Sequence, residues 1–252
     1  MTFYQLYTVL NEKYPKELSC EWDNDGLMCS FDLNRQVKSI LVALDVTMDT
    51  VKYAIDNGYD TVISHHPLVF RSQKGLTSSN YTQKKLIELV KNDINVLSFH
   101  TRLDAAFGGV NDTLCAVLGL KNVVSDPLDP IGRLGELDKS ITLSTFAENV
   151  KSSLNSPVVL YAGDKEVRKI YVVGGDGKDL IPNAISCGAD TLLTGRASYN
   201  TMIDAKDMGV NIVEAGHFFT ENPVCNTVKN HLLEISKDFK VDIYNSNNIS
   251  FK

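Results

Sequence analysis

Short apolar runs alternate along this chain with segments of helical periodicity. Residues 40–44 and 170–173 are β-branched runs of the kind found in buried parallel strands. Apolar residues at helical spacing follow in 51–55, and Gly58 stands where the C-cap of a helix is expected. A new strand is predicted at 60–63. Strands that alternate with helices predict an α/β fold with mostly parallel sheets.

The strand–helix–strand pattern occurs twice. Residues 37–66 and 167–196 align without a gap, and nine of the 30 aligned positions are identical. A shared hydrophobic pattern explains the matching Val and Ile residues. It does not explain the Gly-x-Asp-Thr sequence that recurs in register at 58–61 and 188–191. We therefore expect an internal duplication, with two pseudo-symmetric α/β lobes.

The similarity between the two copies resumes further along the chain. Segments 94–97 and 210–213 are alike, and each follows a stretch with helical character, at 81–91 and 198–208. Between the copies, residues 121–130 contain two prolines and form the expected junction.

Composition narrows the class of protein. The chain has 252 residues, of which 43% are hydrophobic and 22% charged, which is typical of a globular protein with a sizeable core. Twenty-five basic against 31 acidic side chains give a net charge of -6, which argues against a nucleic-acid partner. No apolar run approaches the ~18 residues of a membrane span, and the N-terminus is too polar for a signal peptide. Five cysteines without CxxC spacing indicate neither a disulfide framework nor a cysteine zinc site, so we expect a soluble cytoplasmic protein.

Candidate chemistry follows three of the predicted strands. His65 and His66 come directly after residues 61–63. The other two segments share the spacing His-x-x-x-acid, as His100 with Asp104 and His217 with Glu221. Because ligands in open α/β sheets gather beyond the carboxyl ends of the strands, we expect these side chains to converge on one site.

The residue types in these segments favour metal binding. Four histidines with one Asp and one Glu exceed the needs of a single four-coordinate ion and suit two ions ~3.5–4 Å apart. Imidazole and carboxylate ligands accept Zn, Fe, Mn, Co or Ni, and the pattern does not choose among these divalent transition metals. A His-His pair alone is more commonly structural, so the prediction depends on the convergence of all three segments.

Other segments have weaker claims. Asp45 and residues 22–24 are candidates to line the cavity, or to act as an ordinary helix N-cap and turn. The glycine-rich stretch 174–177 could cradle a phosphate or form a plain tight turn. His231 is expected at the boundary of an amphipathic helix within 222–239.

Several motifs together resemble one family, the NIF-three-like dinuclear-metal proteins, which are commonly labelled GTP cyclohydrolase 1 type 2 homologues. The resemblance runs from about residue 20 to the end of the chain. The motifs are, in order, EWDNDGL at 21–27, ALDVT at 43–47, ISHHPLVF at 63–70, HTRLDAA at 100–106 with GGVND at 108–112, and GHFFTE at 216–221.

The resemblance implies a ligand set for two metal ions per chain. That set is His65, His66, Asp104, His217 and Glu221. His100 then becomes, with Asp45, a candidate to line the cavity or orient a ligand. Longer members carry an inserted domain between the lobes, and this chain looks like the short form. Two arginines depart from the family pattern: Arg102 replaces a small polar residue, and Arg196 stands where an acid is common.

The resemblance also implies a function and an assembly. It implies a metal-dependent hydrolase in which a metal-activated water opens a purine nucleotide, as a GTP cyclohydrolase does. A non-catalytic metal-binding or interaction protein with a structural dinuclear centre remains the alternative. A homohexamer with its metal centres facing an internal cavity is implied, which would suit small diffusible substrates.

The expected lobes follow from the placement of the candidate ligands. Because the C-terminal segment carries two of them, we expect it to return to the first lobe. The first lobe would then comprise residues 1–125 plus 217–252 and the second residues 126–216, with the metal site at the strand ends between the lobes.

Overall fold

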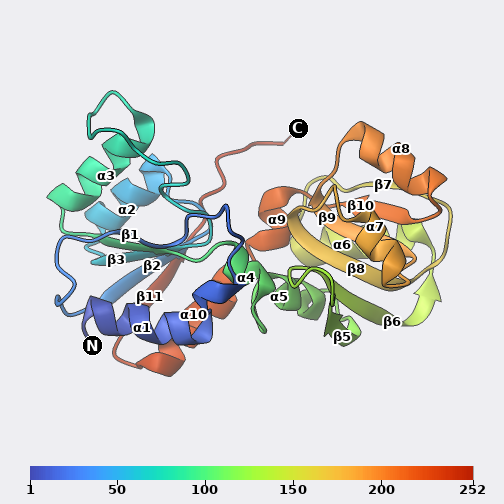
Figure 1. Ribbon diagram of the computed structural model, residues 1–252, viewed down its shortest axis with the longest axis horizontal. Helices are drawn as coiled ribbons and strands as arrows, with labels where there is room; N and C mark the ends of the chain where they lie inside the picture. The colour runs from blue at the N-terminus through green and yellow to red at the C-terminus, as the bar shows by residue number, and fades with distance from the viewer. Residues whose placement is uncertain (252) are drawn as a thin grey trace. The chain divides into compact units, whose positions relative to one another are not determined.

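The computed structural model describes residues 1–251, and the chain divides into two compact units (Figure 1). The first unit comprises residues 1–103 and 225–249, and the second comprises residues 104–224 together with 250–251. Each unit contains one β-sheet with helices, which confirms the α/β prediction.

The first unit holds a five-stranded sheet in the order β1-β4-β3-β2-β11. Strands β4, β3, β2 and β11 run parallel to one another, and β1 pairs antiparallel with β4. This sheet is mostly parallel, as predicted. Its strands are β1 (Gly26–Cys29), β2 (Ser39–Ala43), β3 (Thr61–Ser64), β4 (Asn95–Ser98) and β11 (Lys240–Tyr244). The helices are α1 (Phe3–Lys13), the 3-10 turn η1 (Lys16–Leu18), α2 (Met48–Asp56), α3 (Tyr81–Lys91) and α10 (Val224–Ile235).

Helices cover both faces of this first sheet. Figure 1 shows α2 and α3 on one face and α1 with α10 on the other. Leu41, Val62 and Val96 from three neighbouring strands are fully buried in one cluster with helix residues Val51 and Leu89. Because side chains alternate across a strand, the intervening residues face the opposite helices, and every position of β2, β3 and β4 except Ser39 is buried.

The second unit holds a six-stranded sheet in the order β5-β6-β8-β9-β10-β7. Only the β8–β9 and β9–β10 pairs are parallel, so this sheet is mixed rather than mostly parallel. Its strands are β5 (Lys121–Ser125), β6 (Arg133–Ile141), β7 (Leu160–Ala162), β8 (Val167–Asp176), β9 (Thr191–Arg196) and β10 (Asn211–Glu214). The helices are α5 (Val110–Val117), α6 (Leu143–Leu154), α7 (Ile181–Ser186), α8 (Tyr199–Asp207) and α9 (His217–Glu221).

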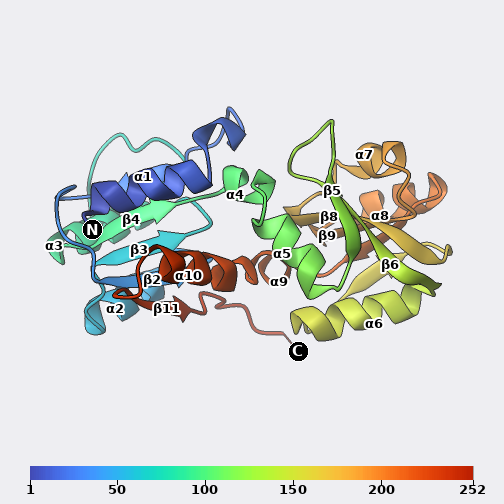
Figure 2. The same cartoon turned by 90° about the horizontal axis from the view of Figure 1, so that it is seen from below.

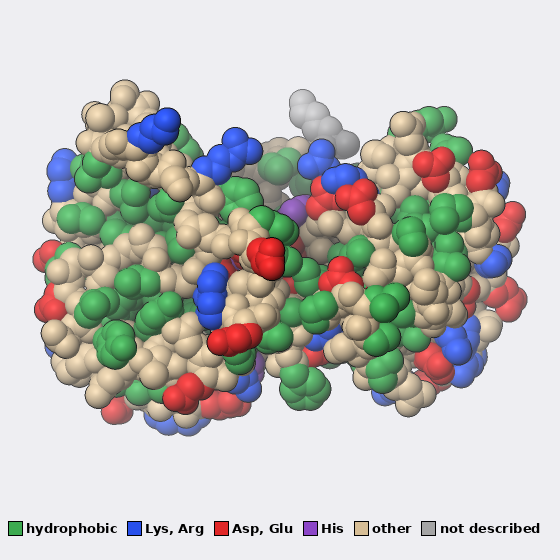
Figure 3. All heavy atoms as spheres, viewed as in Figure 1, with side chains coloured by type: hydrophobic (Ala, Val, Ile, Leu, Met, Phe, Trp, Pro, Cys, Tyr) green, Lys and Arg blue, Asp and Glu red, His purple; other side chains and the backbone are tan. Residues whose placement is uncertain are grey.

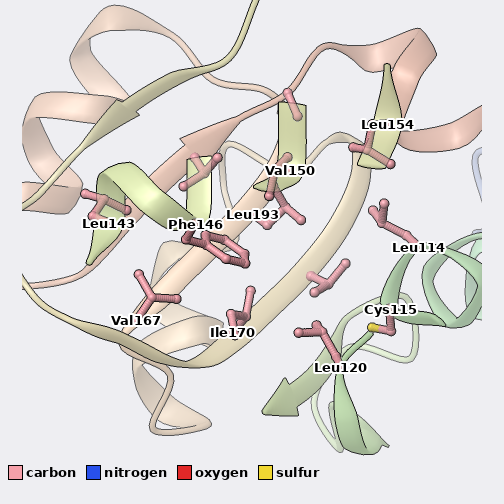
Figure 4. Close-up of a cluster of buried hydrophobic side chains, with 13 residues drawn as sticks. Leu114, Cys115, Leu120, Leu143, Phe146, Val150, Leu154, Val167, Ile170 and Leu193 are labelled. Carbon is pink, nitrogen blue, oxygen red and sulfur yellow. The ribbon is translucent and has the colours of Figure 1, made fainter. Parts of the chain in front are cut away.

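Two apolar clusters fill the second unit, one on each face of its sheet. In the first, Phe146 and Val150 of α6 point toward Ile170 of β8 and Leu193 of β9 (Figure 4). The second joins Ile181 of α7 to the opposite faces of β8 and β9. The alternation of Ile170 with Tyr171 along β8 assigns consecutive residues to different clusters, as the period of a strand requires.

The internal repeat has a physical cause that the structure makes visible. Ile40 pairs with Thr61 in one copy, and Ile170 pairs with Thr191 at the same register in the other. One carboxylate oxygen of Asp60 accepts hydrogen bonds from the backbone N–H groups of residues 38 and 39, at 2.8 and 2.9 Å. Asp190 accepts the equivalent bonds from residues 168 and 169, at 2.9 and 2.8 Å. The repeated Asp therefore ties the start of each first strand to the start of its neighbour.

The glycine of the repeat has an equally specific role. Gly58 and Gly188 follow α2 and α7 with φ of 67° and 72°, a left-handed conformation that favours glycine. The predicted duplication of the strand–helix–strand unit is thus confirmed at the level of single hydrogen bonds and backbone angles.

The compact units begin and end at other residues than the expected lobes. The predicted junction, 121–130, instead forms the edge strand β5 and the turn after it, because β5 pairs antiparallel with β6. Helices α5 and α9 belong to the second unit because both contact β8. The chain crosses between the units within α4 (Thr101–Ala105), again after the first residue of α10, and a third time between residues 249 and 250.

The surface carries charges of both signs. On the face drawn in Figure 3, basic and acidic side chains are interspersed on each unit, in keeping with a net charge of -6. Among the described residues, no helix combines the length and the apolarity that crossing a membrane demands.

Candidate metal centre

Three histidines of the first unit meet at the carboxyl ends of its parallel strands. His65 and His66 follow β3, and His100 follows β4. One ring nitrogen of each can be chosen so that all three lie within 4.8 Å of one another. His65 is 2% exposed, and the side chains of His66 and His100 are 24% and 18% exposed. The prediction that these strand ends gather imidazoles is confirmed within this unit.

The hydrogen bonds of the three rings assign their tautomers. Nδ1 of His65 lies 3.0 Å from the carbonyl oxygen of Phe99, which can only accept. Nδ1 of His66 lies 2.7 Å from the carboxylate of Asp45. Nδ1 of His100 lies 2.9 Å from the carboxylate of Asp23. In each neutral ring Nδ1–H therefore donates, and the lone pair resides on Nε2, as in most metal-binding histidines.

Asp23 holds His100 and the start of α4 together. Its second oxygen accepts hydrogen bonds from the backbone N–H and the hydroxyl of Thr101, at 3.0 and 2.6 Å. Burial alone would raise the pKa of Asp23, but the hydrogen bonds from His100 and Thr101 lower it to about 2. Asp23 thus stays ionised at neutral pH and orients the ring of His100. The sequence predicts for Asp23 only a cavity-lining position or a turn, and it does not reveal the hydrogen bond to His100.

One imidazole and two carboxylates are the candidate ligands of the second unit. Helix α9 places Nε2 of His217 3.0 Å from Oε2 of Glu221, one turn apart. One oxygen of Asp104 and one of Glu221 lie within 4.8 Å of each other. Asp104 is 8% and Glu221 4% exposed, whereas the side chain of His217 is 44% exposed. The His-x-x-x-acid spacing of 217–221 therefore does bring its two side chains together.

Glycines at the end of β8 make room for Glu221. Gly175 has a φ of 65°, and a Cβ atom there would lie 2.2 Å from Oε1 of Glu221. A Cβ atom on Gly195 of β9 would lie 2.4 Å from the hydroxyl of Thr220. The glycines thus allow α9 to approach the sheet closely enough to bury a carboxylate.

The glycine-rich stretch is therefore not a phosphate cradle. The N–H of Gly174 donates to Asn111 at 2.7 Å, that of Gly175 to Thr220 at 3.2 Å, and that of Gly177 to Thr194 at 2.9 Å. Because protein side chains already accept from these three donors, the tight-turn interpretation is the one that the structure supports.

The two arginines that depart from the family pattern lie in different settings. Arg102 is fully buried and donates to both oxygens of Asp25, at 2.9 and 2.8 Å, and to Asn11 at 2.6 Å. It therefore stabilises the first unit internally. Arg196 is exposed at the end of β9.

His231 serves a structural role in the first unit. It lies on α10, and its Nδ1 shares a hydrogen bond with the hydroxyl of Tyr14. Burial lowers the pKa of His231 and, with nearby Glu234, raises that of Tyr14. This agrees with the boundary position predicted for it.

Comparison with known proteins gives this arrangement a context. A curated protein of Clostridium perfringens named GTP cyclohydrolase 1 type 2 homolog is 38% identical over 242 residues, covering 93% of this chain and 92% of that protein. A Lactococcus lactis protein of the same name is 33% identical over 242 residues, with the same coverage.

Solved structures agree with the sequence matches. The crystal structure of Staphylococcus aureus protein SA1388 superposes with a TM-score of 0.91 at 29% identity, over 100% of this chain and 99% of that one. A Bacillus cereus protein related to NIF3 gives a TM-score of 0.90 at 26% identity, with the same coverage. The family described as Duf34/NIF3 (NGG1p interacting factor 3) matches residues 1–250. On the combined evidence of its strand-end histidines, its sequence relatives and its fold, the chain belongs to the Duf34/NIF3 family.

Proposed function

We propose that this protein is a metal-dependent hydrolase that binds two divalent transition-metal ions through five side chains. These are His65, His66, Asp104, His217 and Glu221. The observation that carries the proposal is the contact made by each first-unit histidine, whose Nδ1 atom lies 2.7 to 3.0 Å from an oxygen acceptor. That arrangement fixes the orientation of the ring and leaves Nε2 as the basic nitrogen that a metal needs.

The course of the chain supports a shared centre. The chain passes between the units at residues 103/104, 224/225 and 249/250, and Asp104 and Glu221 lie next to the first two of these boundaries. The resemblance of the motifs implies the same five ligands. We therefore propose that the donors of both units act together on the ions.

The residues around such a centre would have different roles. When bound, two ions would lower the pKa of a water molecule and polarise a substrate oxygen. Asp45 would hold the ring of His66, and Asp104 and Glu221 would supply carboxylate oxygens to the ions. His100, oriented by Asp23, is the candidate to line the cavity.

The names of the relatives support a substrate class. Those proteins are named GTP cyclohydrolase 1 type 2 homologs, so we propose a small nucleotide as the substrate, opened hydrolytically in its purine ring. A soluble cytoplasmic homohexamer would present its centres to such small molecules.

Metal content is the first test. Protein purified without chelator should hold close to two transition-metal ions per chain by elemental analysis. His65→Ala in the first unit and Glu221→Ala in the second should each lower that number, because removal of a ligand leaves coordination that water must complete. His231→Gln, which changes the one histidine outside the cluster, is the matched control and should retain both ions. Metal-free wild-type protein would refute the proposal.

Hydrolysis is the second test. The metal-loaded protein should convert GTP, with loss of guanine absorbance, and a chelator should abolish this conversion. Nucleotides and phosphoesters other than GTP belong in the same screen. Two bound ions without any turnover would overturn the hydrolase and favour the non-catalytic alternative.

A further inference from the structure

Two exposed aromatic side chains border the histidine cluster of the first unit. Trp22 is 64% and Phe70 46% exposed, although both are large apolar residues. Their ring centroids lie 6.1 Å apart, and each ring meets His100 edge-to-face, at 6.2 and 6.3 Å. The interplanar angles of the three contacts are 68°, 74° and 88°, so in each contact the edge of one ring meets the face of the other.

The segments that carry these rings are fixed in place. Asp23, next to Trp22, has a fully buried side chain that bonds His100 and Thr101. The backbone N–H of Cys20 donates to the hydroxyl of Thr101 at 3.0 Å. The side-chain amide of Asn24 donates to the carbonyl of Val69, which ties the Trp22 segment to the Phe70 segment. The exposure of the rings therefore occurs on an ordered framework.

Charge near the rings favours an anionic ligand. Between residues 66 and 80 the chain carries exposed Arg71 and Lys74 and no acidic residue. In the segment of residues 20–25, which carries Trp22, Asp23 is paired with His100. Asp25 is paired with Arg102 and Lys16, so Glu21 is the exposed acid of this segment. A ligand with a planar ring and a phosphate would match both the aromatic faces and the basic segment.

We propose that Trp22 and Phe70 form a stacking platform that holds the base of a nucleotide beside His100, with Arg71 and Lys74 facing its phosphate. This rests on the proposed function for the role of the neighbouring histidines. Stacking on an aromatic side chain tolerates any base, because each has a π-face, and the polar specificity would come from elsewhere.

Trp22 is the one tryptophan of the chain, so its fluorescence reports directly on this platform. Guanosine monophosphate added to the intact metal-loaded protein should quench the emission, whereas ribose 5-phosphate and inorganic phosphate at equal concentration should not. Phe70→Leu should weaken guanosine monophosphate binding about tenfold, and Phe70→Tyr should restore it. Replacing Arg71 and Lys74 with Ala should weaken the binding of guanosine monophosphate and leave the affinity for guanosine unchanged.

Equilibrium dialysis extends the test to Trp22 itself. Trp22→Leu should weaken guanosine monophosphate binding about tenfold, and Trp22→Phe should recover part of it. Tyr199→Leu removes an aromatic ring that is 79% exposed in the second unit and should bind as the wild type does. Elemental analysis should find the metal content of all these variants unchanged.

The outcomes separate this inference from the proposed function. Wild-type affinity in Trp22→Leu, or quenching by ribose 5-phosphate equal to that by the nucleotide, would refute the platform even where two ions are bound. Base-dependent quenching in a protein that holds no metal would support the platform and refute the hydrolase.

Discussion

Arg102 stabilises the first unit, which carries the histidine cluster, through a buried ion pair. Its guanidinium is fully buried and binds Asp25 through two nitrogens, while the side chain of Asp25 is equally inaccessible. Removing one partner of a buried pair leaves an uncompensated charge. We expect Arg102→Met to lower the free energy of unfolding by about 3–5 kcal/mol in urea. Arg196→Met, at an exposed position, should change it by less than about 0.5 kcal/mol, and equal losses would contradict the assigned role.

The same pair predicts a dependence on pH. Burial would raise the pKa of Asp25, but the hydrogen bonds from Arg102 and Lys16 lower it. A folded-state pKa below the unfolded value gives stability that is present above about pH 4 and is lost as pH falls through the folded pKa. The deficit of Arg102→Met relative to the wild type should therefore shrink between pH 6 and pH 3. A deficit that is constant over this range in urea titrations would show that the ion pair is not its cause.

Single residues also mark how far the sequence could predict the site. His65, His66 and His100 were expected together because each follows a strand of one parallel sheet. The acceptors that orient them were harder to foresee. Phe99 acts through a backbone carbonyl, which no residue type signals, and Asp23 belongs to a segment that also reads as an ordinary turn. The buried carboxylate of Glu221 depends on Gly175, whose role becomes visible only when α9 and β8 are seen in contact.

At the scale of elements, the end of β8 and helix α9 form one functional piece. We expect Gly175→Ala to displace Glu221, since the added methyl group would meet its carboxylate at 2.2 Å. Elemental analysis should then find less bound metal. Gly188→Ala is the matched control, because its φ of 72° is similar but nothing lies within 4 Å of the added atom. It should cost about 1 kcal/mol of stability and retain the metal. Equal metal content in the two variants would contradict this account of β8 and α9.

Elements differ in how strongly their own residues determine them. Helix α3 spans Tyr81–Lys91 as expected, since its periodicity and flanking Asn80 cap act locally. The parallel strands β2, β3, β8 and β9 were expected because they are apolar on both faces. Strands β5, β6 and β7 were not, because β5 and β7 are largely exposed, β6 is mostly partly buried or exposed, and the pairing of all three is antiparallel. The edge strands β5 and β7 depend on distant partners, and a polar run like β6, although it lies inside the sheet, carries no clear signal of its own.

At the scale of the whole molecule, assembly is the property to measure. We expect light scattering to give the mass of a homohexamer in both low and high salt. Closed symmetric assemblies are the common form of soluble oligomers. Large exposed apolar residues, such as Phe107 at 92%, are available to be covered by another copy. A mass near the 27.9 kDa of a single chain under both conditions would refute the hexamer.

The interrupted first unit has a consequence for the order in which the chain is made. A ribosome synthesises β2 early and its neighbour β11 only after all of residues 104–224 have emerged. During that interval the nascent first sheet exposes the N–H and C=O groups of β2 along an open edge, in a strand whose side chains are almost all buried in the finished fold. Such edges pair readily with other chains. The time needed to synthesise residues 104–244, most of which belong to the second unit, therefore sets how long each new molecule is at risk of aggregating.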